Sequence, residues 1–230
     1  MSHQEVLKLF DGLRLADIRD GMDWAGLHGV GSVTPEIGPI FQGAAAIGIA
    51  HTVLCRPTQK RVPTLSPEEY SAWALEWYEQ RYPDRARVQP NVKPGEFVVY
   101  ESAGTGSGEI GSANSLEWHA MGAVGIVTSG GVRDVDECVQ HRIPIFSRHR
   151  AQTMVQGYSE LVDTQVPINL AGTLVRPGDV VVANGDGVLI VPQEHAETVA
   201  KYARRELDQD KEWRARWYDK LGWDDSRRIL

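Results

Sequence analysis

The sequence predicts a mixed α/β fold, a three-layer α/β/α arrangement built as a single domain. Segments whose apolar residues recur at helical spacing alternate with short apolar runs bounded by glycine or proline, which are typical of buried strands. A length of 230 residues suits one compact core. Seven tryptophans and seven tyrosines need a folded interior, so the chain is not predominantly disordered.

The charge balance and the apolar pattern limit which binding partners and which cellular compartments are expected for this protein. The 24 basic and 31 acidic residues give a net charge of −7, which disfavours a nucleic-acid or anionic-membrane surface. The most apolar stretch, residues 43–55, is shorter than the ~20 residues that span a bilayer, and the N-terminus lacks the pattern of a signal peptide. Two cysteines form neither a metal-finger spacing nor a disulfide framework. We expect a soluble cytoplasmic protein with no nucleic-acid or membrane partner.

The N-terminal part of the chain predicts two helices and a buried strand. Residues 3–11 and 15–25 have helical patterns. A turn-rich stretch with four glycines and two prolines follows at residues 26–39. The apolar run at residues 44–54 lies between Gly43 and Pro57 and predicts a buried strand.

An aromatic helix is predicted to begin after Ser66. The sequence Ser-Pro-Glu-Glu at residues 66–69 is a capping box with proline at the first helical position, and the helix should run to about residue 81. One face carries an apolar stripe of Tyr70, Trp73, Ala74, Trp77 and Tyr78. Such a stripe usually faces the core or another subunit, and the alternative is an aromatic lid over a ligand.

The second half of the chain predicts short strands and helices in alternation. Strands are expected at 97–101, 124–128 and 144–146, and helices at 114–121 and 135–140. The turn at residues 185–187 should join strands 180–183 and 188–191 into a hairpin. A charged helix at about 194–220 ends the pattern.

The glycine-rich stretch after the strand at 97–101 suggests a nucleotide-binding turn. Gly106, Gly108 and Gly111 fit the G-x-G-x-x-G spacing, between a predicted strand and a predicted helix. Such a unit normally opens its domain, however, and the next strand ends without the acidic residue that would bind a ribose. A dinucleotide or methyl-donor site is therefore the minor alternative, although backbone N–H groups at a helix start can still hold a small anion.

A second glycine pair precedes an arginine and a carboxylate. Residues 122–134 form a buried strand that ends in Gly130 and Gly131, and Arg133 and Asp134 follow near its carboxyl end, where open α/β sheets bind ligands. A carboxylate can hold a hard cation and its waters, while a guanidinium can bind a carboxylate or a developing oxyanion. An isolated surface pair of this kind is usually only solvated, so the surrounding sequence decides the interpretation.

The Gly-Gly-Val-Arg-Asp segment resembles the signature of the family that contains the class II 4-hydroxy-4-methyl-2-oxoglutarate / 4-carboxy-4-hydroxy-2-oxoadipate aldolases and the regulator of ribonuclease activity A (RraA-like proteins). Residues 16–26, 41–53, 93–101 and 175–192 are similar to other stretches of the family pattern. The resemblance implies a swivelling α/β/α sandwich, a homotrimer or homohexamer, a Mg²⁺ or Mn²⁺ ion, and cleavage of a 2-oxo acid with release of pyruvate. Oxaloacetate decarboxylation is implied as a related activity.

The resemblance also implies roles for individual residues. Arg133 would bind the pyruvyl carboxylate and stabilise the enolate, and Asp134 would ligate the metal. Glu101 stands where the family usually has an aspartate that orients metal-bound water, and its side chain is one methylene longer. The family's Gly-Glu-Leu-Leu stretch, whose backbone N–H groups hold the substrate carboxylate, corresponds here to Gly111, Ser112, Ala113 and Asn114, with Ser112 in place of the usual acid.

One departure from the family pattern concerns the substrate, and the residue that moves the proton remains an open choice. Residues 56–92 are longer than the corresponding family stretch, so we expect this aromatic helical insertion to shape the substrate side of the pocket or a subunit contact. The general base is left open among four residues that could reach a neighbouring subunit's site: His28, Glu36, Glu206 and Glu212. His51, within the predicted first core strand, is expected to be buried and hydrogen-bonded.

These observations predict a divalent-metal-dependent lyase that acts on a short 2-oxo acid, such as a 4-hydroxy-2-oxo dicarboxylate. The alternative is a non-catalytic regulator that binds ribonuclease or RNA-decay proteins, since the resembled family includes such members. The Arg133–Asp134 pair favours the enzyme, because a pure binding protein does not need it.

Overall fold

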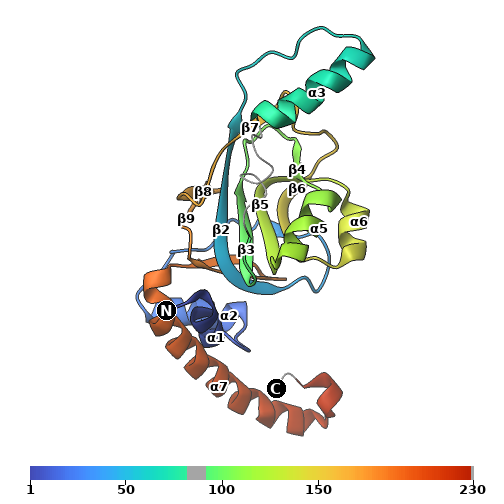
Figure 1. Cartoon of the computed structure of the whole chain (residues 1–230). Helices are drawn as coiled ribbons and strands as arrows, with labels where there is room; N and C mark the ends of the chain where they lie inside the picture. Colours follow the sequence, from blue (N-terminus) through green and yellow to red (C-terminus); the bar gives the residue numbers. More distant parts are fainter. Residues whose placement is uncertain (82–91, 229–230) are drawn as a thin grey trace.

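The computed structural model describes residues 1–81 and 92–228 (Figure 1). Its helices are α1 (His3–Leu9), α2 (Leu15–Trp24), α3 (Pro67–Arg81), α5 (Ser112–Met121), α6 (Val135–His141) and α7 (Ala196–Leu221), with 3-10 turns at Gln193–His195 and Asp225–Arg227. Its strands are β1 (Gly38–Pro39), β2 (Ala46–Pro57), β3 (Glu96–Glu101), β4 (Gly108–Ile110), β5 (Gly125–Val132), β6 (Ile145–Arg150), β7 (Ser159–Thr164), β8 (Ile168–Leu170), β9 (Thr173–Val175), β10 (Val180–Asn184) and β11 (Gly187–Val191).

One large sheet organises the chain, with strand order β1-β6-β5-β3-β2-β10-β11. Strands β2, β3, β5 and β6 are parallel neighbours, and β10 and β11 form the predicted antiparallel hairpin. The segment 32–39 bridges the two edges, because Ser32 pairs with Leu189 of β11 and Gly38 pairs with Ser147 of β6. The sheet is therefore nearly closed into a barrel.

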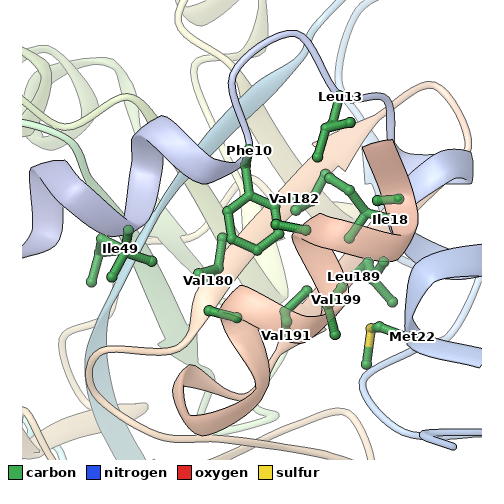
Figure 2. Close-up of a cluster of buried hydrophobic side chains, with 14 of the residues drawn as sticks. Phe10, Leu13, Ile18, Met22, Ile49, Val180, Val182, Leu189, Val191 and Val199 are labelled. Atoms are coloured by element: carbon green, nitrogen blue, oxygen red, sulfur yellow. The ribbon is translucent and has the colours of Figure 1, made fainter. Parts of the chain in front are cut away.

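The alternation of side chains along the strands creates an inner and an outer apolar surface. Phe97 and Val99 of β3 point into the barrel interior, while Val98 and Tyr100 pack toward Trp118 of α5. Helices α1, α2 and α7 cover the outer face of β10 and β11, in the cluster drawn in Figure 2. The helices thus surround the sheet, and the predicted mixed α/β fold in one domain is confirmed.

The packing of α2 against α7 depends on one glycine. A Cβ atom at Gly21 would lie 2.6 Å from the Val199 carbonyl oxygen and 2.7 Å from the Ala203 nitrogen, so only glycine allows this close approach of the two helices. The first half of α7 is buried through Ala203 and Leu207. Its second half runs away from the barrel, as Figure 1 shows.

The predicted aromatic helix is present as α3. Ser66 and Glu69 form the capping box through two reciprocal hydrogen bonds of 2.8 and 3.3 Å. Trp77 is buried against Val155, whereas Tyr70 remains exposed at the other end of the stripe. Only part of the stripe therefore faces the protein interior. No described helix combines the length and the hydropathy that crossing a bilayer requires.

Five strands were not predicted from the sequence. They are β1, β4, β7, β8 and β9, which have between two and six residues each and are too short or too irregular in burial to form a recognisable pattern. Strands β5 and β6 are also longer than the sequence predicts, since β5 continues through its glycine pair and β6 continues through the basic residues 148–150.

The prediction for His51 is confirmed. Its ring is buried in β2, and Nδ1 lies 2.9 Å from the Glu96 carboxylate. Burial lowers the pKa of His51, partly opposed by the hydrogen bond with Glu96.

Candidate active site

Arg133 and Asp134 lie directly after β5, as predicted. The Arg133 backbone N–H donates to the Ile110 carbonyl at 2.8 Å, which ties the turn to β4. Its guanidinium Nε donates to Asp134 Oδ1 at 3.3 Å, and about a third of each side chain is exposed to solvent, 31% and 32%. The two side chains therefore form a pair that a ligand can reach.

The backbone of Asp134 is left-handed, with φ 52° and ψ 40°. Aspartate tolerates this conformation better than most residues, although such backbone strain costs ~1–3 kcal/mol and is concentrated at functional sites. Asp134 Oδ2 also lies 3.3 Å from the Ser112 backbone nitrogen and 3.4 Å from the Ser112 hydroxyl. The carboxylate thus sits between Arg133 and the first turn of α5.

Glycines in the predicted nucleotide-like stretch make room for this pair. A Cβ atom at Gly108 would lie 2.8–3.0 Å from three carbons of the Arg133 side chain. A Cβ atom at Gly111 would lie 2.8 Å from Asp134 Oδ2. Between them the chain forms β4, which pairs with β5. Packing against Arg133 and Asp134 therefore explains Gly108 and Gly111, whereas Gly106 adopts a left-handed backbone with φ 77°.

The four residues predicted to bind substrate lie at the start of α5, beside the pair. The Gly111 N–H donates to Asn114 Oδ1 at 2.7 Å, and the Asn114 amide donates to the Glu109 carbonyl at 2.9 Å. Asn114 therefore caps the helix with its side chain. Contact between this turn and a substrate stays a prediction.

Glu101 is held at the end of β3 by two partners. Its carboxylate accepts a hydrogen bond from Arg56 at 2.7 Å and one from the Asn169 backbone N–H at 2.6 Å. Among the described residues, Glu101 makes no hydrogen bond or ion pair with Arg133 or Asp134. Its predicted role in orienting water stays a prediction.

A cavity of about 440 Å³ adjoins Arg133, within the size range of small-molecule sites. Besides Arg133, its walls are made by Tyr70, Gln152, Thr153, Met154, Gln156 and Tyr158. Residues 152–158 were not predicted from the sequence, because they carry neither a motif nor a periodic pattern. Tyr70 belongs to the aromatic stripe for which a ligand lid was the alternative interpretation.

The four candidates for the general base lie elsewhere in the chain. Glu36 pairs with Arg148, whose Nε donates to it at 2.7 Å, and Glu206 pairs with Arg205 at 3.0 Å. His28 and Glu212 are exposed. None of the four lines the Arg133 cavity in the part of the chain that the structure describes.

A buried carboxylate that the sequence analysis did not select lies on β4. Glu109 is 6% exposed, and its Oε1 accepts a hydrogen bond from the Ala103 backbone N–H at 3.0 Å. Burial raises the pKa of Glu109, while the Ser102 hydroxyl and the Ala103 N–H lower it in part. The burial that distinguishes Glu109 is not visible in the sequence.

The side chains that could ligate a metal favour Mg²⁺ over Zn²⁺. Across residues 1–81 and 92–228, no three histidine, cysteine, aspartate or glutamate side chains are grouped closely enough to hold a metal. A tetrahedral zinc site needs three or four such ligands, whereas Mg²⁺ often binds one or two carboxylates and keeps several waters. Asp134 alone therefore fits an ion of the magnesium type.

Comparisons with known proteins identify a family and a fold that this chain shares. The sequence model of a family described as "RraA-like: Aldolase/RraA" matches residues 15–190. A Halalkalibacterium halodurans protein named "Putative 4-hydroxy-4-methyl-2-oxoglutarate aldolase" is 29% identical over 128 residues, which are 52% of this chain and 57% of that protein. The match thus spans little more than half the length of that curated relative.

Solved structures share the fold over nearly the whole chain. The crystal structure of an uncharacterized Pseudomonas syringae pv. tomato protein has a TM-score of 0.72 at 25% identity, covering 96% of this chain and 94% of that one. Streptomyces coelicolor RraAS2, described as an unusual member of the RNase ES inhibitor RraA protein family, has a TM-score of 0.72 at 22% identity, covering 91% and 96%.

Proposed function

The chain belongs to the RraA-like family, and from that premise we propose that it is a divalent-cation-dependent lyase that cleaves a carbon–carbon bond of a short 2-oxo acid and releases pyruvate. The observation that carries the proposal is the exposed Arg133–Asp134 pair after β5, with the cavity beside Arg133. Such a reaction requires a positive group that binds the substrate carboxylate, a carboxylate that binds the divalent ion, and a cavity for a small molecule. Arg133, Asp134 and the adjoining cavity could supply these three.

Arg133 would bind the carboxylate of the pyruvyl group. A guanidinium has five N–H donors. Among the described residues, the Arg133 side chain uses only its Nε–H in a hydrogen bond, to Asp134, and the Arg133 backbone N–H donates to Ile110. The terminal N–H groups can then pair with a ligand carboxylate in the two-pronged geometry that arginine favours. Arg133 would also stabilise the negative charge that develops on the 2-oxo oxygen.

Asp134 would hold Mg²⁺ or Mn²⁺, directly or through water, and the first turn of α5 fixes its carboxylate. When bound, such an ion supplies a Lewis acid that polarises the 2-oxo group. Glu101 would orient a water molecule, and the backbone N–H groups at the start of α5 would assist in holding the substrate carboxylate.

The bond changes follow from these positions. A base removes the C4 hydroxyl proton, the C3–C4 bond breaks, and its electron pair passes to C3 to form the pyruvate enolate. A proton delivered to C3 completes pyruvate, and the C4 fragment leaves as a carbonyl compound. With oxaloacetate the same bond breaks, CO₂ leaves, and Arg133 faces the same enolate, so decarboxylation would be a second activity of one site.

We propose a homotrimer or homohexamer as the active assembly. The base would then come from an adjacent subunit, from His28 or Glu36 of the N-terminal region or from Glu206 or Glu212 of α7. Support for a base from another subunit comes from the positions of these residues, since none lines the Arg133 cavity within the described residues of one chain.

The second candidate is a non-catalytic regulator of ribonuclease complexes. The fold shared with RraAS2 favours it. The Arg133 cavity favours the lyase, because surface contact with another protein requires neither a cavity of this size nor an ion pair at its edge.

The first experiment measures pyruvate release from oxaloacetate and from 4-hydroxy-4-methyl-2-oxoglutarate, with Mg²⁺ and with a chelator. Asp134→Ala should abolish the metal-dependent release. Asp136→Ala is the matched control, because it removes an exposed carboxylate two residues further along in the first turn of α6. If neither compound yields pyruvate with a folded protein, the lyase is excluded for both, and capture of RNA-decay proteins becomes the next test.

A further inference from the structure

We propose that the Arg133 cavity selects 2-oxo acids whose distal group is an uncharged aromatic ring. This inference rests on the proposed function, because it takes the pyruvyl end of the substrate to lie at Arg133. The distal group is the part beyond C3, which leaves as the carbonyl product when the bond is cleaved. Three features of the cavity wall support an aromatic ring in that position.

The first feature is the charge of the wall. Among the described residues that line the cavity, Arg133 is the only charged one. A second carboxylate at the far end of a substrate would therefore exchange water for neutral groups such as Gln152, Thr153 and Gln156 without gaining a cation, and a charge without a counter-charge is costly to desolvate. The wall thus favours a substrate with one carboxylate over a dicarboxylate.

The second feature is a group of exposed large side chains. Tyr70, Met154 and Tyr158 line the cavity and are 36%, 46% and 46% exposed. Apolar surface gathered around one cavity commonly marks a binding site. Tyrosine rings stack on aromatic groups, and a methionine sulfur makes favourable contacts with a ring. An aromatic distal group is therefore the kind of group that these side chains would bind.

The third feature is that this wall is held in position. The Tyr70 ring lies 5.2 Å from Trp73, and Trp73 lies 5.3 Å from Trp77, measured between ring centroids. Trp77 is buried against Val155, so a ladder of rings connects Tyr70 to the segment 152–158. The insertion thus contributes a fixed face of the cavity.

The same segment is tied to the strand beside Arg133. The Gly108 N–H donates to the Thr153 carbonyl at 3.0 Å, and a Cβ atom at Gly108 would lie 2.8 Å from Cγ of Arg133. The segment that carries the aromatic wall is therefore joined through the backbone to the strand packed against the base of the Arg133 side chain. A substrate anchored at Arg133 would present its distal group to Tyr70, Met154 and Tyr158.

Binding is tested with two 2-oxo acids that lack a C4 hydroxyl and cannot undergo the retro-aldol cleavage: 4-phenyl-2-oxobutanoate and 2-oxoglutarate. In calorimetry with Mg²⁺, 4-phenyl-2-oxobutanoate should bind at least ~10-fold more tightly than 2-oxoglutarate, because a tenfold difference in Kd requires only a small difference in binding free energy. Tyr70→Ala should reduce this ratio several-fold. Leu75→Ala, which removes an exposed side chain from the same helix outside the cavity, should leave the ratio unchanged.

A gain of affinity gives a second test that does not depend on loss of a side chain. Met154→Lys places a cation in the wall and should reverse the preference toward 2-oxoglutarate. Turnover is then compared for 4-hydroxy-2-oxo-4-phenylbutanoate and 4-hydroxy-2-oxoglutarate, with pyruvate quantified chromatographically. Both compounds have the same pyruvyl half.

The outcomes separate this inference from the proposed lyase. Cleavage of both compounds with a preference for the dicarboxylate overturns the inference and leaves the lyase standing. Tighter binding of the phenyl compound with no cleavage of either substrate supports the ligand class and refutes the lyase for these substrates. Binding of neither oxo acid overturns the inference.

Discussion

Substitution of Gly108 by alanine is the sharpest test of how the chain positions Arg133. Gly108 is buried in β4 and has no positive φ, so alanine is compatible with its backbone. The added Cβ atom would lie 2.8, 2.9 and 3.0 Å from Cγ, Cβ and Cδ of Arg133. Carbon atoms pack favourably at ~3.5–4.0 Å, so all three contacts are too close.

The magnitude follows from the kind of atoms involved. Cβ and Cγ belong to the base of the Arg133 side chain, so they cannot move away without a shift of the backbone or a new rotamer. Overpacking of this kind costs ~1–3 kcal/mol. At ~2–4 °C per kcal/mol for a chain of this size, the melting temperature should fall by ~2–12 °C. The displaced guanidinium should also lower pyruvate release.

The assay is thermal unfolding of a double-mutant cycle with Arg133→Ala, which removes Cγ and Cδ. The cost of Gly108→Ala should be smaller in that background, because two of the three contacts are absent. Gly185→Ala is the control, since its added Cβ meets no atom within 4 Å and its backbone is exposed. An equal cost of Gly108→Ala in both backgrounds would refute the packing argument.

Three further predictions follow from buried groups. Burial raises the pKa of Glu109, so the charged carboxylate opposes folding at pH values above its ordinary pKa of 4.5. The urea midpoint of Glu109→Gln should therefore increase relative to that of the wild type as the pH rises from 4 to 7.5. A difference between the two midpoints that stays constant over this range would contradict the prediction. Burial lowers the pKa of His51, which lies beside Glu96 and Lys93, so the stability of the wild type should fall as the pH drops below 6.5. In urea unfolding, the stability of His51→Gln should fall less steeply over the same pH range. Trp77→Ala removes the anchor of α3, so limited proteolysis should cut within residues 58–81 much faster while far-UV circular dichroism changes little.

The sequence predicts elements well where a repeated pattern is long. The hairpin of β10 and β11 was found because two continuous apolar runs flank the turn at residues 185–187, and α7 was found because its helical pattern extends over many turns. Strand β7 runs along β2 with only Ser159 fully buried, so its side chains show no alternation. Strands β8 and β9 have three residues each, too few for a pattern.

Glycines misled the prediction of β5 for a physical reason. Gly130 and Gly131 have low strand propensity and suggested a turn. They lie inside the strand because neighbours occupy the space of a side chain: added Cβ atoms would lie 2.3 Å from Ser102 Oγ and 2.9 Å from His149 Nε2. A sequence without coordinates does not distinguish a glycine that turns the chain from one that admits a close neighbour.

Only part of the candidate site could be predicted from the sequence. Arg133 and Asp134 could be found from the sequence because they directly follow a predicted strand and belong to a short contiguous segment that resembles the family signature. Tyr70 and residues 152–158 reach Arg133 only through contacts between distant segments, namely the ring ladder to Val155 and the hydrogen bond from Gly108 to Thr153. The half of the candidate site that is proposed to anchor the substrate is therefore encoded locally, and the half that would select the substrate is encoded in tertiary packing. Changes in substrate preference should accordingly map to the insertion and to 152–158, while loss of all activity should map to the turn at 133–134.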